Sequence, residues 1–267
     1  MSTYYIFRLL RSLRLLFAIA LLSGCVTTMQ IDRSYNAISQ DSRIQFLVLH
    51  YTFGNFDSSL KTLTQGPVSS HYLVDVNPPR ILQLVDENKR AYHAGVSYWK
   101  GATGLNASSI GIEIVNAGER PGPNGLVWAD YPKEQIDVVI ALVKKIVTEH
   151  NIPPERVLGH SDIAPNRKVD PGPKFPWKRL ADLGLVLWPD EAKTAQRIRG
   201  FEAQLPDVLW FQRKLAAHGF NPPLNNELDE ATRQIISAFQ MKYRQSNFDG
   251  KPDAQTAALL DELTQGK

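Results

Sequence analysis

Short apolar runs alternate with polar loops along the first two thirds of the chain. Runs rich in Ile, Leu and Val at 45–50 and 109–115 predict two strands. Shorter runs at 71–76 and 81–85, separated by a proline-rich turn, predict two more. A further short run at 157–159 precedes a histidine. Short apolar runs bounded by polar loops indicate the strands of a β-sheet.

One long segment instead carries the spacing of a helix. Its apolar positions form a single stripe, namely Ile136, Val139, Ile140, Val143, Ile146 and Val147. Pro132 lies near the expected start, and the prolines at 153 and 154 prevent the helix from continuing. Strands alternating with loops beside a long helix predict a mixed α/β or α+β domain at 43–190, with a central, mostly β-sheet flanked by helices.

The last quarter of the chain predicts a small helical module. Residues 191–205 are interpreted as a linker, and 206–267 contain three short helical patterns. The first pattern ends at Gly219, a typical residue after a helix C-terminus. Ile235, Ile236, Phe239 and Tyr243 mark the second, while Asp253 is a candidate N-cap for the third. About 60 residues in three helices can fold, though with marginal stability.

The N-terminus has the organisation of a bacterial lipoprotein signal. Arg8, Arg11 and Arg14 precede an apolar run at 15–22 that is too short to span a bilayer. Leu22-Ser23-Gly24-Cys25 resembles the lipobox, which predicts a signal peptide at 1–24, lipidation of Cys25 and a tether at 25–42. The alternative is a core helix with an incidental cysteine. Cys25 is the chain's single cysteine, and Val26 after it favours anchoring in the outer membrane, facing the periplasm.

The charge balance excludes a general affinity for polyanions. The three arginines of the signal account for the net charge of +3, because the rest of the chain has as many basic as acidic residues. The mature protein is therefore not expected to bind nucleic acid or an anionic membrane surface through net charge.

Three residues at the ends of predicted strands or in a tight turn suit a catalytic metal. His50 and His160 each end a short apolar run, and Asp170 precedes Pro171-Gly172 ten residues after His160. Two histidines and a carboxylate are a known ligand set for catalytic Zn²⁺, with the fourth position left for water. Each residue alone could be a hydrogen-bonded structural side chain. Together they predict one Zn²⁺ per chain.

Two further ionisable residues suit catalysis beside such a metal. Glu113 lies in the middle of a predicted strand, on the face of Gly111 and opposite three isoleucines. Partial burial there would raise its pKa towards the range of a general acid/base, although an exposed glutamate on a one-sided sheet is also possible. Lys168, two residues before Asp170, could stabilise an oxyanion or be a surface lysine. His71 and His93 could line a groove or be core histidines.

These segments in this order resemble the type 2 N-acetylmuramoyl-L-alanine amidases, kin of the peptidoglycan recognition proteins. The resemblance is carried by five motifs within 43–190, at 48–52, 70–72, 92–95, 109–113 and 159–172. It implies Zn²⁺ on His50, His160 and Asp170, with Glu113 as acid/base and Lys168 as transition-state helper. It also implies a groove for the lactyl-peptide stem near Tyr51, Thr52, His71, His93, Asn116 and Arg167.

The resemblance implies hydrolysis of the amide between the lactyl group of N-acetylmuramic acid and L-alanine. Residues 206–267 are similar to peptidoglycan-binding helical modules through Phe239-Gln240 and Asp249-Gly250, but lack the glycine-rich spacing expected in their first half. Two rival functions remain open, a zinc peptidase that cuts within the stem peptide and a non-catalytic peptidoglycan receptor. The expected partners are a muropeptide and, through Cys25, a membrane, and nothing predicts an obligate oligomer.

Overall fold

A computed structural model describes residues 29–123 and 125–265 of the chain. The chain divides into two units, 1–41 and 42–267. In the first unit the described residues, 29–41, are exposed and form neither helix nor strand. The predicted signal peptide and Cys25 lie outside the described residues. Among the residues described, no helix has the length and apolar character needed to cross a membrane.

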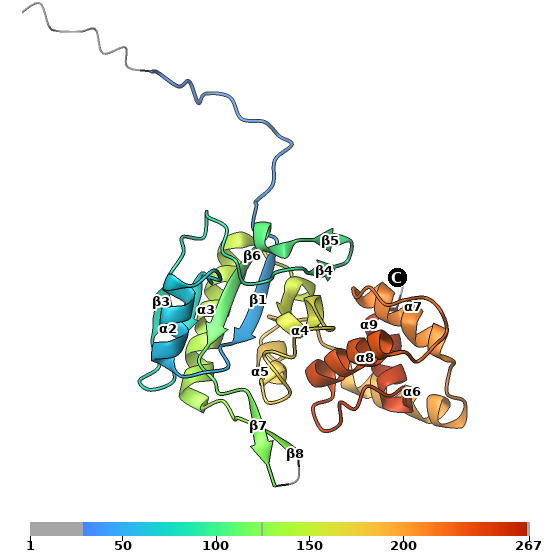
Figure 1. The fold of residues 1–267 in the computed structure, drawn as a ribbon. Coiled ribbons are helices and arrows are strands. Elements are labelled where there is room, and N and C mark those ends of the chain that lie inside the picture. Colours follow the sequence, from blue (N-terminus) through green and yellow to red (C-terminus); the bar gives the residue numbers. More distant parts are fainter. Residues whose placement is uncertain (1–28, 124, 266–267) are drawn as a thin grey trace, which may run out of the picture. The chain divides into compact units, whose positions relative to one another are not determined.

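A five-stranded sheet organises the second unit (Figure 1). Its strand order is β3-β2-β6-β1-β9, and β3 alone among these strands runs antiparallel to its neighbour. The strands are β1 (Phe46–Tyr51), β2 (Tyr72–Val74), β3 (Ile81–Gln83), β6 (Ser109–Ile114) and β9 (Val157–Gly159). All five predicted strands are therefore present. The four strands other than β3, namely β2, β6, β1 and β9, are parallel, so their carboxyl ends meet at one edge of the sheet.

Two small hairpins extend from this sheet domain. One pairs β4 (Tyr98–Trp99) with β5 (Ala102–Thr103), and the other pairs β7 (Glu119–Gly122) with β8 (Gly125–Trp128). Short 3₁₀ turns, η1 (Leu105–Ala107) and η2 (Pro154–Arg156), precede β6 and β9.

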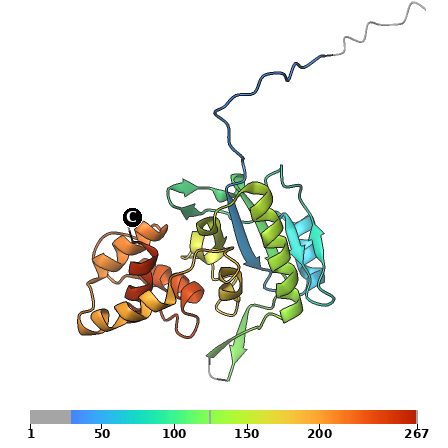
Figure 2. The same cartoon turned by 180° about the vertical axis from the view of Figure 1, so that it is seen from behind.

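Helix α3 (Lys133–His150) covers one face of the sheet, as Figure 2 shows from behind. Its predicted apolar stripe packs against the alternate strand residues Leu47, Leu49 and Ile112. The helix ends where Asn151 adopts a left-handed conformation, before the two prolines. Burial of this stripe against the sheet confirms the predicted helix and its apolar face.

The opposite face is covered by two groups of helices. Helix α2 (Phe56–Gln65) packs over Leu73 of β2. Phe46 and Val48 of β1 share one buried cluster with the C-terminal helices. The remaining helices are α4 (His160–Ile163), α5 (Trp177–Ala181), α6 (Glu191–Ala203), α7 (Val208–His218), α8 (Glu230–Tyr243) and α9 (Ala254–Leu263). The predicted mixed α/β fold with a C-terminal helical module is confirmed.

The segment at 191–205, interpreted from the sequence as a linker, has regular structure and packing partners of its own. Most of this segment forms α6, whose N-cap is Asp190, and α6 packs along α9. The side chain of Arg197 reaches Asp261 at 2.6 Å and Glu262 at 3.1 Å. The segment has few apolar residues, so its helical stripe is weak. Its partners on α9 lie more than 60 residues away, where local pattern does not reveal them.

Candidate metal centre and catalytic cleft

The sheet register brings the two predicted histidine ligands together. His50 lies near the end of β1, and β9 pairs with β1 so that Leu49 is opposite Gly159. His160 follows Gly159 directly and opens α4. Both imidazoles are almost completely buried. Strand pairing therefore places the two rings side by side at the carboxyl edge of the sheet.

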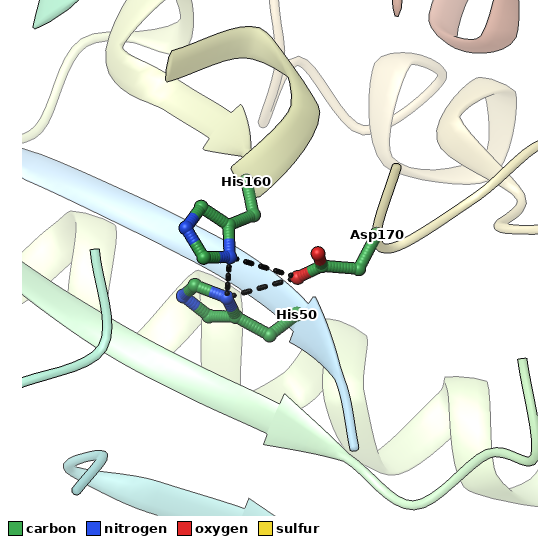
Figure 3. Close-up of side chains that lie close together, drawn as sticks. All are labelled: His50, His160 and Asp170. Atoms are coloured by element: carbon green, nitrogen blue, oxygen red, sulfur yellow. Dashed lines mark hydrogen bonds and ion pairs between the residues drawn. The ribbon is translucent and has the colours of Figure 1, made fainter. Parts of the chain in front are cut away.

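Asp170 completes a compact cluster of three donor atoms (Figure 3). The Nδ1 atoms of His50 and His160 are 3.0 Å apart, and they lie 3.0 and 3.1 Å from Oδ2 of Asp170. Two hydrogen bonds fix the aspartate segment: Ser161 N–H donates to the Asp170 carbonyl at 2.9 Å, and Tyr131 O–H donates to the Pro171 carbonyl at 2.8 Å.

The outer nitrogens of the two rings are committed as donors. His160 Nε2 lies 3.1 Å from the Ala94 carbonyl, which can only accept, and this contact is shorter than the 3.4 Å to Nη2 of Arg167, which can only donate. Behind His50, the Ser109 hydroxyl donates to the Leu105 carbonyl at 2.6 Å, so its oxygen accepts from His93 Nε2–H at 3.2 Å. The Nδ1 of His93 then carries a lone pair and accepts from His50 Nε2–H at 3.0 Å.

In the neutral rings, this network leaves lone pairs on the two Nδ1 atoms that face Asp170. Burial and the nearby His160 lower the pKa of His50 to about 4, so its ring is neutral at pH 7. Burial alone would raise the pKa of Asp170, but interaction with His160 and His50 holds it well below the ordinary value. Two imidazole lone pairs and a carboxylate converge, and this donor set fits a divalent cation.

Gly111 makes the approach of His93 possible. A Cβ at this position would lie 2.5 Å from Cγ of His93, closer than any side chain allows. Because both nitrogens of His93 have protein partners, we assign it to the positioning of His50. The resemblance implied a groove contact for His93, which also lines the cleft, whereas the sequence gave no signal for its hydrogen bond with Ser109.

Two of the predicted groove residues, His71 and Asn116, do not line the cleft. His71 is fully buried and does not line the cleft, because its Nδ1 accepts from Gly111 N–H and its Nε2 donates to the Lys89 carbonyl. Asn116 is also buried. Its amide donates to the Asp130 carbonyl at 3.1 Å, and its carbonyl accepts from Gly118 N–H at 2.8 Å, so it braces the loop before β7.

The three clustered donors line an open cleft of about 640 Å³, within the size range of small-ligand sites. The predicted residues Tyr51, Thr52 and Arg167 line it. The guanidinium of Arg167 donates to the carbonyls of Ala94 and Val96, which ties it to the cleft rim. The cleft is rich in ionisable groups, including Glu113, Glu119 and Lys168. Helix α2 supplies the opposite wall through Ser58, Ser59, Thr62 and Leu63.

Glu113 lies beside His50 on the neighbouring strand, because the parallel register of β1 and β6 pairs the two residues. Its carboxyl group lines the cleft from an otherwise apolar strand. Burial raises the pKa of Glu113 well above its ordinary value, the charge of Asp170 adds to this, and Lys168 opposes it. The site thus contains one carboxylate suited to a cation and one suited to carrying a proton.

Comparison with known proteins agrees with this geometry. Residues 40–173 match the family described as N-acetylmuramoyl-L-alanine amidase, and residues 204–260 match one described as a peptidoglycan binding domain. The chain is 41% identical to N-acetylmuramoyl-L-alanine amidase AmiD of Escherichia coli (strain K12) over 264 residues, which cover 93% of this chain and 95% of that protein. The chain belongs to the N-acetylmuramoyl-L-alanine amidase family. In this amidase His50, His160 and Asp170 form the donor cluster, and Glu113 lies opposite His50 on the neighbouring strand.

Solved structures extend the similarity of this amidase to most of the chain. A complex of E. coli AmiD with the substrate anhydro-N-acetylmuramic acid-L-Ala-D-gamma-Glu-L-Lys matches with a TM-score of 0.79 and 41% identity, covering 88% of this chain and 94% of that chain. AmpDh3 from Pseudomonas aeruginosa, in complex with anhydromuramic pentapeptide, matches with a TM-score of 0.81 and 38% identity over 88% of this chain and 97% of that chain.

Proposed function

We propose that this amidase is zinc-dependent and hydrolyses the amide between the lactyl group of N-acetylmuramic acid and L-alanine of the peptidoglycan stem peptide. The observation that carries the proposal is the convergence of His50, His160 and Asp170 donor atoms within about 3 Å of one another. The muropeptide ligands in the solved structures of AmiD and AmpDh3 support the choice of substrate.

The ligand set leaves room for catalysis. Catalytic Zn²⁺ sites use three protein ligands and keep one position open, and the cluster opens onto the cleft on its remaining side. Bound Zn²⁺ would lower the pKa of water to about 7 and polarise a carbonyl oxygen. The hydrogen bonds that run from His50 through His93 to Ser109 would keep the His50 ring in the tautomer that such a cation needs. The bond from His160 to the Ala94 carbonyl would do the same for the His160 ring.

Glu113 acts as the proton carrier of the reaction. It accepts a proton from the attacking water as the water oxygen bonds to the carbonyl carbon, and it donates that proton to the nitrogen of L-alanine as the C–N bond breaks. The raised pKa of Glu113 supports this role, because an ordinary carboxyl group is too weak a base for efficient transfer at neutral pH.

Lys168 and the cleft wall hold the substrate. The ammonium of Lys168 lines the cleft two residues before Asp170 and stabilises negative charge developing on the carbonyl oxygen. Tyr51, Thr52 and Arg167 contact the lactyl-peptide stem from the cleft rim. The C-terminal match to a peptidoglycan binding domain supports contact of the helical module with the same polymer.

The function is tested by metal analysis together with mass spectrometry of a digested muropeptide. We expect one Zn²⁺ per chain and release of an intact peptide that begins with L-alanine. A chelator should abolish this release, and added Zn²⁺ should restore it. Cleavage between two amino acids would instead identify a stem peptidase. Binding of the muropeptide without any product would identify a receptor.

We also propose that a monomeric chain is anchored to the outer membrane through lipidated Cys25 and faces the periplasm. The lipobox-like sequence before Cys25 and its position upstream of an exposed segment at 29–41 support this proposal. Replacing Cys25 with Ser should move the protein from the membrane fraction to the soluble periplasmic fraction, measured by immunoblotting after fractionation. Val26→Ala is the matched control and should stay in the membrane. Retention of the Cys25→Ser variant would contradict the lipid anchor.

A further inference from the structure

Two segments follow β9, one carrying His160 and the other Asp170, and the C-terminal end of helix α8 contacts both. Lys242 Nζ donates to Oδ2 of Asp162 at 2.7 Å, and Asp162 lies two residues after His160. Gln245, just beyond α8, donates from Nε2 to the Phe175 carbonyl at 2.5 Å, five residues after Asp170. A helix of the C-terminal module therefore reaches the backbone on each side of the cluster.

The ion pair between Lys242 and Asp162 is enclosed by protein. The side chains of Lys242 and Asp162 are 5% and 1% exposed. The ammonium also donates to the Val157 carbonyl at 3.2 Å and lies 4.4 Å from the centre of the Trp177 ring. A lysine is rarely buried without a partner, and a buried pair repays its desolvation only when its geometry is well satisfied.

This ion pair belongs to a set of hydrogen bonds that joins the residues before His160 to those after it. The same Oδ2 atom of Asp162 accepts the Gly159 N–H at 2.8 Å, so the residues on either side of the histidine are joined. Lys242 adds a bond to Val157, where β9 starts. The histidine backbone is thus held by one ammonium that contacts both the strand before it and the helix after it.

Close packing beside this ion pair links it to the segment that carries Asp170. A Cβ on Gly159 would lie 2.8 Å from Cδ of Pro171 and 3.2 Å from Cζ2 of Trp177, so the two ligand segments are in close contact. The ammonium of Lys242 also lies over the ring of Trp177. A displacement of Lys242 would therefore disturb both segments together.

We propose that Lys242 is a positioning residue for the metal centre, and that the helical module sets the geometry of His160 and Asp170 through the Lys242–Asp162 pair and Gln245. The module is then a structural part of the metal site, in addition to any contact it makes with the polymer. This inference rests on the zinc site proposed above.

The test measures Zn²⁺ affinity of the full chain by competition with a chromophoric chelator. Lys242→Met removes the ammonium with little change in volume, and we expect about 10- to 100-fold weaker Zn²⁺ binding, as for other groups behind metal ligands. Gln245→Ala should weaken binding in the same direction by a smaller factor. Lys214→Met is the matched control, because Lys214 pairs with Asp261 at 2.8 Å within the module. Its Zn²⁺ affinity should equal that of the unaltered protein.

Thermal unfolding of the metal-free variants separates positioning from simple stability. If Lys242→Met and Gln245→Ala lower the unfolding temperature but retain full Zn²⁺ affinity, the inference is overturned. Should Lys242→Met fail to fold, Gln245→Ala decides alone, and unchanged affinity in that variant overturns the inference. An unaltered protein that binds no Zn²⁺ refutes the proposed function itself, so the two failures are distinguishable.

Discussion

Replacing Glu113 with Gln is expected to lower kcat for muropeptide hydrolysis by about 10²- to 10⁴-fold, the contribution typical of a positioned general acid/base. Glutamine keeps the size and polarity of the side chain but cannot accept the proton of the attacking water. Because Glu113 is not among the three donor atoms of the cluster, the variant should bind Zn²⁺ as tightly as the unaltered protein. The measurement is kcat by chromatography of released peptide, with Zn²⁺ content determined on the same samples.

A second carboxylate in the cleft provides the matched control. Glu119 lines the same cleft from hairpin β7–β8, and replacing it with Gln should change kcat far less. If Glu113→Gln kept most of its activity, another group would have to carry the proton. Equal losses in both variants would point to the overall charge of the cleft and not to a specific proton carrier.

The pH dependence of kcat/KM follows from the raised pKa of Glu113. The reaction needs this carboxyl group unprotonated when water attacks, so activity should rise as pH increases through its pKa. Burial and the charge of Asp170 place that pKa above the ordinary glutamate value of about 4.3, so the acidic limb should lie at higher pH than an exposed carboxyl would give. Glu113→Gln should remove this limb from its residual activity profile.

The strand ends explain why the sequence alone pointed to residues that the fold brings into one donor cluster. A histidine that directly follows a short apolar run must lie at a sheet edge, and β1 and β9 proved to be neighbours with parallel register. The face of the strand on which Glu113 lies could be predicted in the same way. Three isoleucines alternate with its side of the strand, and they are buried on the opposite face. The local sequence pattern was sufficient to predict the position of a residue when that position depends only on the strand that carries it.

Contacts between distant segments could not be predicted in this way. His71 and His93 looked alike in sequence, yet His71 is enclosed between β6 and the turn at Lys89, while His93 fills the space left by Gly111 beside His50. The ion pair of Lys242 with Asp162 joins residues 80 positions apart, and nothing in either local pattern reveals it. Such pairings depend on how layers pack, which periodicity does not encode.

Replacing Asp170 with Asn should abolish both Zn²⁺ binding and hydrolysis. The amide has nearly the same shape but no negative charge, and the two imidazole lone pairs would lose the carboxylate that balances a divalent cation. We expect Zn²⁺ affinity to fall by more than the roughly 100-fold loss typical of a group behind the ligands.

Thermal unfolding with and without Zn²⁺ gives a readout that is independent of catalysis. A ligand at 100 times its dissociation constant stabilises the folded state by about 2.7 kcal/mol, so Zn²⁺ should raise the unfolding temperature of the unaltered protein and leave that of Asp170→Asn unchanged. Asp75→Asn is the matched control, because Asp75 is a buried carboxylate that pairs with Arg80 and does not line the cleft. It should retain the Zn²⁺-dependent shift. A full shift in Asp170→Asn would mean that the cation binds elsewhere, and the assignment of this cluster would then be wrong.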